Sequence, residues 1–346
     1  MKKIYKKTLI YFFKFFYSQI NLAKKKYSDS FIEKEIKIQN LDVKIYRIKK
    51  CRLYTNTLDV AVIKNNYLLN GPSFQIRNNL NASIKENSII LTGTPKFYKK
   101  IKGRVFSLLT GVDSNNNYYH WFFDCLPKLF FYNKFYNLKK NDYFLVPSIK
   151  HNFQRESLKI LGIKNILNAY DVKHFYIDNL ITTNFTNFGD NPPLKIINYL
   201  RKVFISSNKS KTKIKKLFLN RLSSPLNQRD ILNKKEVLNL LKKKKFKIIN
   251  PSEKKLSNQI KYFNGSNYII GVHGAAFTNI IFCKKNTRII ELSVKNSNNK
   301  TISNIAKKLK LRFKTFYFKS IDKNKNLKSW DGHFYISKDK LYKMIN

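Results

Sequence analysis

The second part of the chain alternates continuously apolar runs with helical patterns, and this order restricts the fold more than any other feature of the sequence. The apolar runs lie at 216–219, 245–249, 268–270, 288–292 and 313–318, and the helical patterns lie at 234–244, 254–263, 275–282 and 300–310. Strands that are apolar throughout are buried on both faces of a sheet, and strands joined by helices run parallel. The pattern therefore predicts a Rossmann-like α/β domain over residues 215–346.

The first part of the chain is less regular. Its expected elements are strands at 43–46, 88–91, 143–146 and near 173–184, and helices at 118–127, about 153–161 and 192–206. Since domains of about 100–200 residues are typical, we expect an N-terminal α/β domain at 31–205, a polar linker at 206–214 and the C-terminal domain at 215–346.

Residues 1–30 form a basic, aromatic N-terminal segment. Four lysines precede the run 9–13 (LIYFF), and Lys14 separates this run from 15–17 (FFY). The lysine interrupts the apolar run too early for a membrane span of about 20 residues, and no clear signal-peptide cleavage site follows. Two interpretations remain: a helix that lies in an anionic membrane surface, and a first helix that packs on the core.

The chain has 69 Lys and Arg against 20 Asp and Glu, a formal charge of +49 over 346 residues. Its 43% of hydrophobic residues excludes a disordered polyelectrolyte. AT-rich codons favour the same composition, so much of this charge is expected on solvated faces, and a partner of the surface is expected to be anionic. A basic nucleic-acid-binding protein is one alternative. Because the lysines are spread along the whole chain without a nucleic-acid module, no specific nucleic acid is predicted.

The three cysteines, Cys51, Cys125 and Cys283, lie far apart and are odd in number. They predict neither a disulfide framework nor a zinc site, and they suit a reducing, cytoplasmic compartment. No H-E-x-x-H or D-x-D motif occurs, and five His with 20 acidic residues make a complete metal shell hard to assemble. We therefore predict no metal site.

Polar residues follow or end three predicted strands of the C-terminal domain. Arg221 follows the first strand, His273 and Gly274 follow the third, and Glu291 lies near the end of the fourth. Ligands of an open parallel sheet bind in the crevice beyond these ends. Small residues such as Gly274 and Ala275 let a ligand approach the backbone, and a helix N-terminus attracts anions. The segment either binds an anion, with His273 donating to a phosphate oxygen, or is a strand-to-helix turn with a satisfied histidine.

Arg221 and Arg229 flank residues 222–228. Arginine binds phosphate bidentately where lysine acts as a point charge, and only ten of the 69 basic residues are arginine. The two arginines either cradle a diphosphate or are exposed surface residues. Asn233 and Glu236 are interpreted as an N-cap and its reciprocal partner at the start of the next helix, a structural role.

His120 and Asp124 are four residues apart on one predicted helix, which is mostly buried and ends or kinks near Pro127. This spacing places both side chains on the same helix face. The pair is either a catalytic one, with one member as general base, or an internal pair that stabilises a buried helix.

Three segments in this order resemble glycosyltransferase family 61, which includes bacterial surface-polysaccharide enzymes, plant xylosyl- and arabinosyltransferases and animal O-linked N-acetylglucosaminyltransferases. They are 119–128 (YHWFFDCLPK), 220–221 (NR) with 229–233 (RDILN), and 271–279 (GVHGAAFTN) with 289–291 (IIE). Asn220 departs from the family because a second arginine is common there, which leaves fewer phosphate contacts. Lys285 and Asn286 stand where a Pro-Gly turn is usual.

The resemblance implies a GT-B type fold, in which two Rossmann-like domains face each other across a cleft, with the acceptor on the N-terminal side. It implies an inverting, metal-independent transfer without a cofactor, from a nucleotide diphosphate-sugar, first of all a UDP-sugar. The acceptor would be a hydroxyl of a cell-surface or lipid-linked glycan, as in capsule or lipopolysaccharide. In this reading Arg221, Arg229, His273 and the N–H groups of Gly274 and Ala275 stabilise the diphosphate.

Four further residues receive roles from the same resemblance. Glu291 would bind the ribose hydroxyls, and Asn279 would orient the donor or hold its loop. Asp124 would be the base, with His120 as its partner or rival. A catalytically silent membrane-surface scaffold of the same fold is the remaining alternative, and the expected location is cytoplasmic, including the inner face of the cell membrane. The sugar, the linkage and the oligomeric state stay open.

Overall fold

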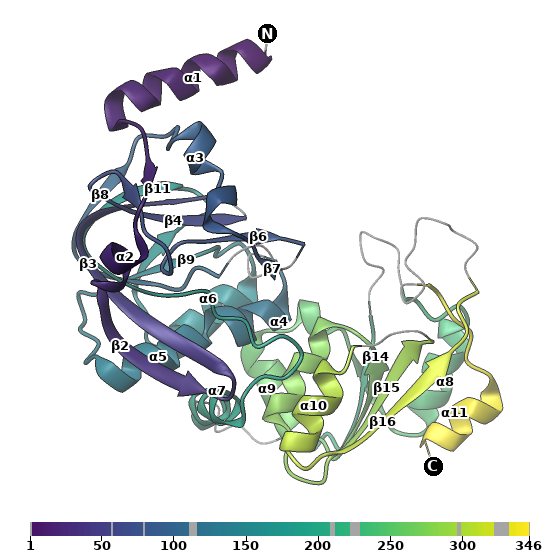
Figure 1. The fold of residues 1–346 in the computed structure, drawn as a ribbon. Helices are drawn as coiled ribbons and strands as arrows, with labels where there is room; N and C mark the ends of the chain where they lie inside the picture. Colours follow the sequence, from purple (N-terminus) through teal and green to yellow (C-terminus); the bar gives the residue numbers. More distant parts are fainter. Residues whose placement is uncertain are drawn as a thin grey trace. The chain divides into compact units, whose positions relative to one another are not determined.

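The computed structural model describes residues 2–56, 58–78, 80–110, 116–207, 212–221, 229–295, 299–321 and 332–345, with side chains from residue 7 onward. The chain divides into two compact units, Met1–Phe188 and Gly189–Asn346 (Figure 1). The division falls before helix α7 (Leu194–Ser206), whereas the sequence analysis placed a linker after it, at 206–214. Helix α7 packs within the second unit, where Arg201 donates to the Cys283 carbonyl at 2.8 Å. Residues 208–211 of the expected linker lie outside the described residues.

Among the described residues, the first unit is built on a mixed sheet of 11 strands. The strands are β1 (Asn21–Leu22), β2 (Ile32–Ile38), β3 (Leu41–Thr55), β4 (Asp59–Lys64), β5 (Tyr67–Leu68), β6 (Phe74–Arg77), β7 (Leu80–Asn81), β8 (Lys99–Ser107), β9 (Tyr143–Val146), β10 (Asn165–Asn168) and β11 (His174–Thr183). The helices and short helical turns are α1 (Lys2–Tyr17), α2 (Lys25–Asp29), η1 (Ile84–Glu86), α3 (Ile89–Thr92), α4 (Tyr118–His120), η3 (Trp121–Cys125), α5 (Pro127–Phe135) and α6 (Asn152–Ile160).

Only the strands toward one edge of this sheet run parallel. Strands β11, β8, β9 and β10 are neighbours and run parallel, with α5 and α6 in the connections, as in half of a Rossmann fold. Strands β2, β3 and β4 pair antiparallel because the short turns between them cannot cross over the sheet. The expectation of a Rossmann-like first domain is therefore met only from β8 to β11, and the unit as a whole is mixed α/β.

Within its described residues, the second unit contains a five-stranded parallel sheet in the order β13-β12-β14-β15-β16. The strands are β12 (Lys216–Leu219), β13 (Lys247–Ile249), β14 (Tyr268–Val272), β15 (Arg288–Val294) and β16 (Arg312–Phe318). The other helices are α8 (Lys234–Lys243), η4 (Pro251–Glu253), α9 (Leu256–Gly265), η5 (Ala275–Phe282), α10 (Thr301–Lys308) and α11 (Lys338–Ile345). Each strand coincides with or overlaps one of the predicted apolar runs, and three extend beyond it by one or two residues, so the parallel α/β prediction for this part is confirmed.

Helices cover both faces of the second sheet, with α8 and α11 on one face and α9 and α10 on the other (Figure 1). The chain passes from β12 to β13 on one side of β12 and returns to β14 on the other side. Ligand crevices of open α/β sheets lie beyond the carboxyl ends of the strands at such a reversal. Gly271 of β14 lies opposite Leu219 of β12, where an added Cβ would lie 2.7 Å from the Leu219 Cβ. Glycine therefore permits the close contact between these two strands.

Candidate active site

The carboxyl ends of β12 and β14 bring Arg221 into contact with the turn at His273 and Gly274. Arg221 Nη1 donates a hydrogen bond to the His273 carbonyl at 3.1 Å. A Cβ atom on Gly274 would lie 3.0 Å from the same nitrogen, whereas its φ of 164° is extended backbone that any residue adopts. Glycine is thus needed here for space beside the guanidinium and not for its backbone freedom.

His273 also contacts Glu291, which lies on the neighbouring strand β15. His273 Nδ1 lies 2.7 Å from Glu291 Oε1, and Thr315 Oγ1 donates to Glu291 Oε2 at 3.3 Å. The side chains of His273 and Glu291 are 14% and 5% exposed, so water screens this contact little. With the carboxylate ionised, the proton lies on Nδ1, and Nε2 has no partner among the residues that the structure describes. The imidazole is therefore the member of this pair that can reach a ligand.

The segment after Gly274 forms η5, a 3-10 helix, and Asn279 fixes it to the unit. The Asn279 side chain is fully buried, and its Nδ2 donates to Gln259 Oε1 on α9 at 2.8 Å and to the Ala276 carbonyl at 3.0 Å. Gly274 and Ala275 stay half-buried at the start of η5. Of the two roles considered for Asn279, this geometry supports the one of holding the loop.

Arg229 is connected to Arg221 through Lys234 and Asp230. Lys234 Nζ donates to the Arg221 carbonyl at 2.8 Å and to Asp230 Oδ1 at 3.0 Å, and Asp230 follows Arg229 directly. Arg229 itself has a φ of 57°, in the left-handed region, and is half-buried. The residues between the two arginines, 222–228, lie outside the described part of the chain. Sequence reasoning passed over Lys234 because lysine is common everywhere in this chain.

In the first unit, the helix expected at 118–127 is divided into three parts. Asn117 caps α4 by accepting from the His120 N–H. A π-helical turn, η3, follows, in which the Leu126 N–H donates to the Trp121 carbonyl at 3.0 Å. Helix α5 then begins at Pro127. π-Helical turns inside helices are frequent at functional sites.

His120 and Asp124 remain in contact despite this change of helix type. His120 Nδ1 lies 2.7 Å from Asp124 Oδ2, and the two side chains are 28% and 11% exposed. The pair is therefore not sealed in the core. A His–carboxylate pair of this geometry can take a proton from a hydroxyl group.

Lys128, four residues after Asp124, ends the segment 119–128 but received no role in the sequence analysis. The side chain is fully buried; its Nζ donates to the Leu109 carbonyl at 2.5 Å and lies 5.4 Å from the centre of the Phe74 ring. Burial lowers the pKa of Lys128 to about 7, against the opposing effects of Cys125 and Asp124. Its position within an apolar run and its place at the end of the family-like segment 119–128 were the sequence signals that set this lysine apart.

No group of three His, Cys, Asp or Glu side chains suited to a metal ion occurs among the described residues. The candidate residues of the second unit are Arg221, Arg229, the His273–Glu291 pair and the small residues after His273, and the candidate of the first unit is the His120–Asp124 pair. An arginine and a glycine turn at the reversal of a parallel sheet are typical of α/β proteins that bind phosphorylated ligands.

A family model described as Glycosyltransferase 61 matches residues 118–290, half of the chain. The chain belongs to glycosyltransferase family 61 and is an enzyme of glycosyl transfer. The match includes both members of the first pair and His273, and it ends one residue before Glu291.

No curated protein sequence matches the chain. One solved structure that resembles it is the bacterial iron-containing dodecameric glycosyltransferase TibC from enterotoxigenic E. coli, with 8% identity over 80% of each chain and a TM-score of 0.27. A TM-score this low supports no inference about the present chain.

Proposed function

We propose that this chain transfers a sugar, with inversion and without a metal ion, from a nucleoside diphosphate-sugar to a hydroxyl of a cell-surface or lipid-linked glycan. The observation that carries the proposal is the contact of Arg221 with the His273 turn, because it gathers a guanidinium, an imidazole and a glycine at the reversal of a parallel sheet. These groups suit a diphosphate, since arginine forms paired hydrogen bonds with phosphate oxygens. A UDP-sugar is the donor to test first.

The donor half of the reaction falls to the second unit. Arg221, Arg229, His273 and the N–H groups of Gly274 and Ala275 stabilise the charge that develops on the leaving diphosphate. Glu291 is 4% exposed and already accepts from His273 and Thr315, which favours holding the imidazole over the ribose contact that the resemblance implies.

The acceptor half falls to the His120–Asp124 pair of the first unit. The pair takes the proton of the acceptor hydroxyl while the oxygen forms a bond to the anomeric carbon. The bond from that carbon to the diphosphate oxygen breaks, and its electron pair leaves with the nucleoside diphosphate. Action of the two units as a GT-B pair is part of this proposal.

Two substitutions test the donor part and the acceptor part of the reaction separately. Arg221→Ala is expected to weaken UDP binding, measured by calorimetry, by at least about tenfold, because hydrogen bonds to charged groups contribute roughly 1.5–3 kcal/mol each. Asp124→Asn is expected to reduce hydrolysis and transfer of a bound UDP-sugar by about a hundredfold or more while UDP binding is retained. Arg312→Ala, an exposed arginine at the opposite, amino end of the sheet, is the control. A panel of nucleotide-sugars with neither binding nor hydrolysis would refute the proposal.

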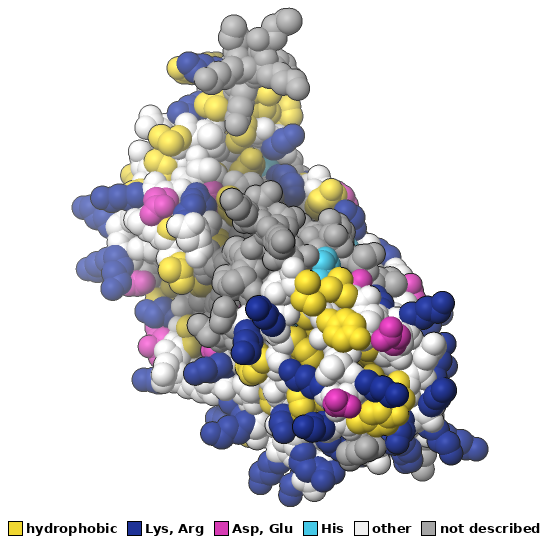
Figure 2. All heavy atoms as spheres, turned by 90° about the vertical axis from the view of Figure 1, so that its right-hand side faces the viewer, with side chains coloured by type: hydrophobic (Ala, Val, Ile, Leu, Met, Phe, Trp, Pro, Cys, Tyr) yellow, Lys and Arg dark blue, Asp and Glu magenta, His cyan; other side chains and the backbone are white. Residues whose placement is uncertain are grey.

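Membrane association through α1 is a second part of the proposal. Phe15 and Phe16 are 86% and 55% exposed, whereas Phe13 is buried with its ring 5.0 Å from the ring of Phe97. Aromatic side chains beside lysines suit the headgroup region of an anionic membrane. No helix among the described residues is long and apolar enough to cross a membrane. Figure 2 shows Lys and Arg spread over the visible face, which suits attraction to an anionic surface and not one localised binding site.

A further inference from the structure

The first unit contains a pocket of about 260 Å³ whose lining is polar but uncharged. It lies between the short strands β6 and β7, the turn η1 and the chain after β11. The side chains that matter here are Asn70, Gln75, Asn81, Asn184 and Phe185. The volume is just below the roughly 300–1,000 Å³ typical of small-molecule sites, so the pocket suits one small ring.

The absence of charge from this lining is unusual in this protein. Charged residues make up 26% of the chain, so a lining of this size would contain roughly two of them by average composition. None of the described residues that line the pocket is Lys, Arg, Asp or Glu. A diphosphate or another anion would find no counter-charge in the lining, so the pocket suits a neutral ligand.

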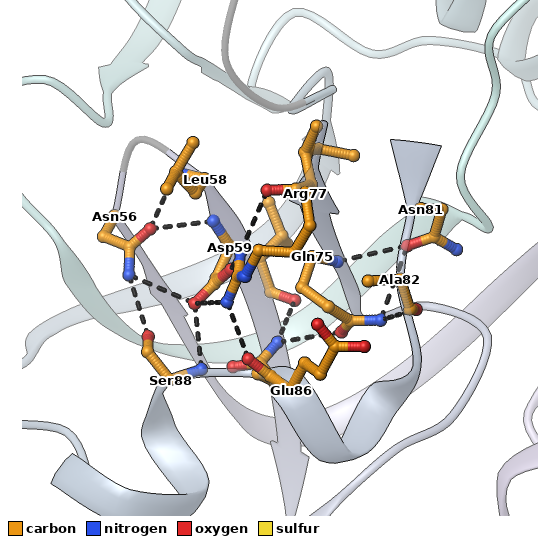
Figure 3. A network of polar contacts seen from close by, with 12 residues as sticks. Asn56, Leu58, Asp59, Gln75, Arg77, Asn81, Ala82, Glu86 and Ser88 are labelled. Carbon is orange, nitrogen blue, oxygen red and sulfur yellow. Dashed lines mark hydrogen bonds and ion pairs between the residues drawn. The ribbon is translucent and has the colours of Figure 1, made fainter. Parts of the chain in front are cut away.

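A network of hydrogen bonds builds the pocket wall before any ligand arrives (Figure 3). The Gln75 N–H donates to Asn81 Oδ1 at 3.2 Å, the Gln75 side chain donates to the Ala82 carbonyl, and Asn87 Nδ2 donates to Gln75 Oε1 at 3.3 Å. These bonds fix the β6–β7 hairpin, which carries two of the pocket amides. Fixed polar groups bind a ligand with less loss of entropy on association.

The same hairpin is anchored by an ion pair between half-buried Arg77 and buried Asp59. Arg77 Nη1 lies 2.7 Å from Asp59 Oδ1, and Arg77 Nη2 also donates to the Glu86 carbonyl at 2.6 Å. Asp59 is 1% exposed and accepts from the Ser88 N–H at 2.9 Å. Arg77 and the surrounding hydrogen bonds lower the pKa of Asp59, so it stays ionised in the pair. Strands β6 and β7 have only four and two residues. The ion pair and hydrogen bonds therefore fix their position beside the pocket.

Two amides and one ring are available to a ligand. The nitrogen of the Asn81 side chain points away from the network in Figure 3, and it has no partner among the described residues, nor has the side chain of Asn70. Amide groups can donate to and accept from the hydroxyl groups of a sugar. Phe185, half-buried against Phe74 at 5.5 Å between ring centres, supplies an apolar surface for the C–H face of a sugar ring.

The pocket is also connected to the helix of the candidate base within the same unit. Phe74 packs against Phe185 and lies 5.4 Å from the ammonium group of Lys128. Lys128 lies four residues after Asp124 in the chain. Two buried side chains, Phe74 and Lys128, thus connect Phe185 of the pocket lining with the segment that carries His120 and Asp124.

We infer that this pocket binds one neutral sugar ring of the acceptor glycan. The acceptor role rests on the proposed function, whereas binding of a neutral sugar by the pocket can be tested without it. Asn81→Asp is the most specific variant because the carboxylate keeps the acceptor for the Gln75 N–H, replaces the donor that faces the ligand by an acceptor and adds one negative charge. Asn70→Trp, at an exposed position, fills the pocket. Asn137→Asp makes the same charge change on an exposed loop and is the matched control.

The probes are the methyl glycosides of glucose, galactose, mannose and N-acetylglucosamine, measured by saturation-transfer NMR on the full chain, with UDP binding measured in parallel. At least one glycoside is expected to bind, with affinity reduced by about fivefold or more in Asn81→Asp and Asn70→Trp and unchanged in Asn137→Asp. Equal binding by wild type and both pocket variants would overturn the inference, as would binding of UDP without binding of any glycoside. Glycoside binding that the pocket variants lose, in a protein that does not bind UDP, would uphold the pocket and refute the proposed donor.

Discussion

Gly274→Ala tests whether Arg221 contributes to the donor site from its observed position. The new Cβ would lie 3.0 Å from Arg221 Nη1, whereas non-bonded heavy atoms pack best at about 3.5–4.0 Å. The guanidinium must therefore move by about half an ångström, and its 3.1 Å bond to the His273 carbonyl would pass beyond the roughly 3.2 Å limit of a good N–H···O bond. Loss of one such bond costs about 1 kcal/mol, which corresponds to about fivefold weaker UDP binding.

The fold itself should tolerate this substitution. The backbone of Gly274 is extended, and alanine at a compatible glycine position raises the free energy of unfolding by about 0.4–1 kcal/mol. Calorimetric UDP titrations on wild type, Gly274→Ala, Arg221→Ala and the double variant form a double-mutant cycle. If the alanine acts through the guanidinium, it costs nothing further once Arg221 is removed. Unchanged UDP affinity in Gly274→Ala, or an equal loss in both backgrounds, would refute the reasoning.

Three further predictions concern a carboxylate, a buried lysine and the first helix. Glu291→Gln is expected to weaken UDP binding by roughly tenfold, because His273 loses a charge-assisted hydrogen bond; unchanged affinity in calorimetry would contradict this. Burial lowers the pKa of Lys128 from its ordinary 10.5 to about 7. Between pH 7 and 10.5 the unfolded chain therefore binds more protons than the native state. The free energy of unfolding should then rise with pH by up to about 1.4 kcal/mol per pH unit. Urea denaturation at pH 7, 8 and 9 should show this gain in wild type relative to Lys128→Met, and parallel pH profiles would argue against it. Serine at Phe15 and Phe16 is expected to reduce binding to vesicles of phosphatidylcholine and phosphatidylglycerol at least fivefold without a change in unfolding temperature, whereas equal co-sedimentation would exclude α1 as the contact.

The fold of the second unit could be predicted because its central strands β12, β14 and β15 are largely apolar and buried and alternate with helical segments. The first unit could be predicted only in part. The run at 88–91 was expected as a strand but lies mostly in helix α3. The prediction was wrong because the local apolar pattern did not reveal the contact of the Ser88 N–H with Asp59. Long-range contacts of this kind decide short segments, and no window of sequence contains both partners.

The candidate site divides in the same way. His120 and Asp124 are in contact because they are four residues apart on consecutive helical turns, so their spacing in the sequence was sufficient to predict the contact. His273 and Glu291 meet because β14 and β15 are adjacent and in register, with Gly271 opposite Glu291, and the sequence placed them only on one rim. Asn233 shows what local sequence could not predict. It contacts Glu236 as expected, but its side chain caps no N–H of α8 and donates to the distant Ile336 carbonyl at 2.9 Å.

The two His–carboxylate pairs share one geometry and differ in what holds them, and this bears on the identity of the base. Both have an Nδ1-to-oxygen distance of 2.7 Å, and in both the imidazole is more exposed than the carboxylate, 28% against 11% for His120 and Asp124 and 14% against 5% for His273 and Glu291. A carboxylate that is more buried than its partner and is bonded to Nδ1 orients the imidazole, so that Nε2 faces the ligand. The acceptor proton would then pass to Nε2 of His120, with Asp124 holding Nδ1, which reverses the order of roles that the sequence favoured. His120→Gln and Asp124→Asn distinguish the two orders: a direct Asp124 base predicts residual transfer in His120→Gln, whereas an imidazole base predicts residual transfer only in Asp124→Asn.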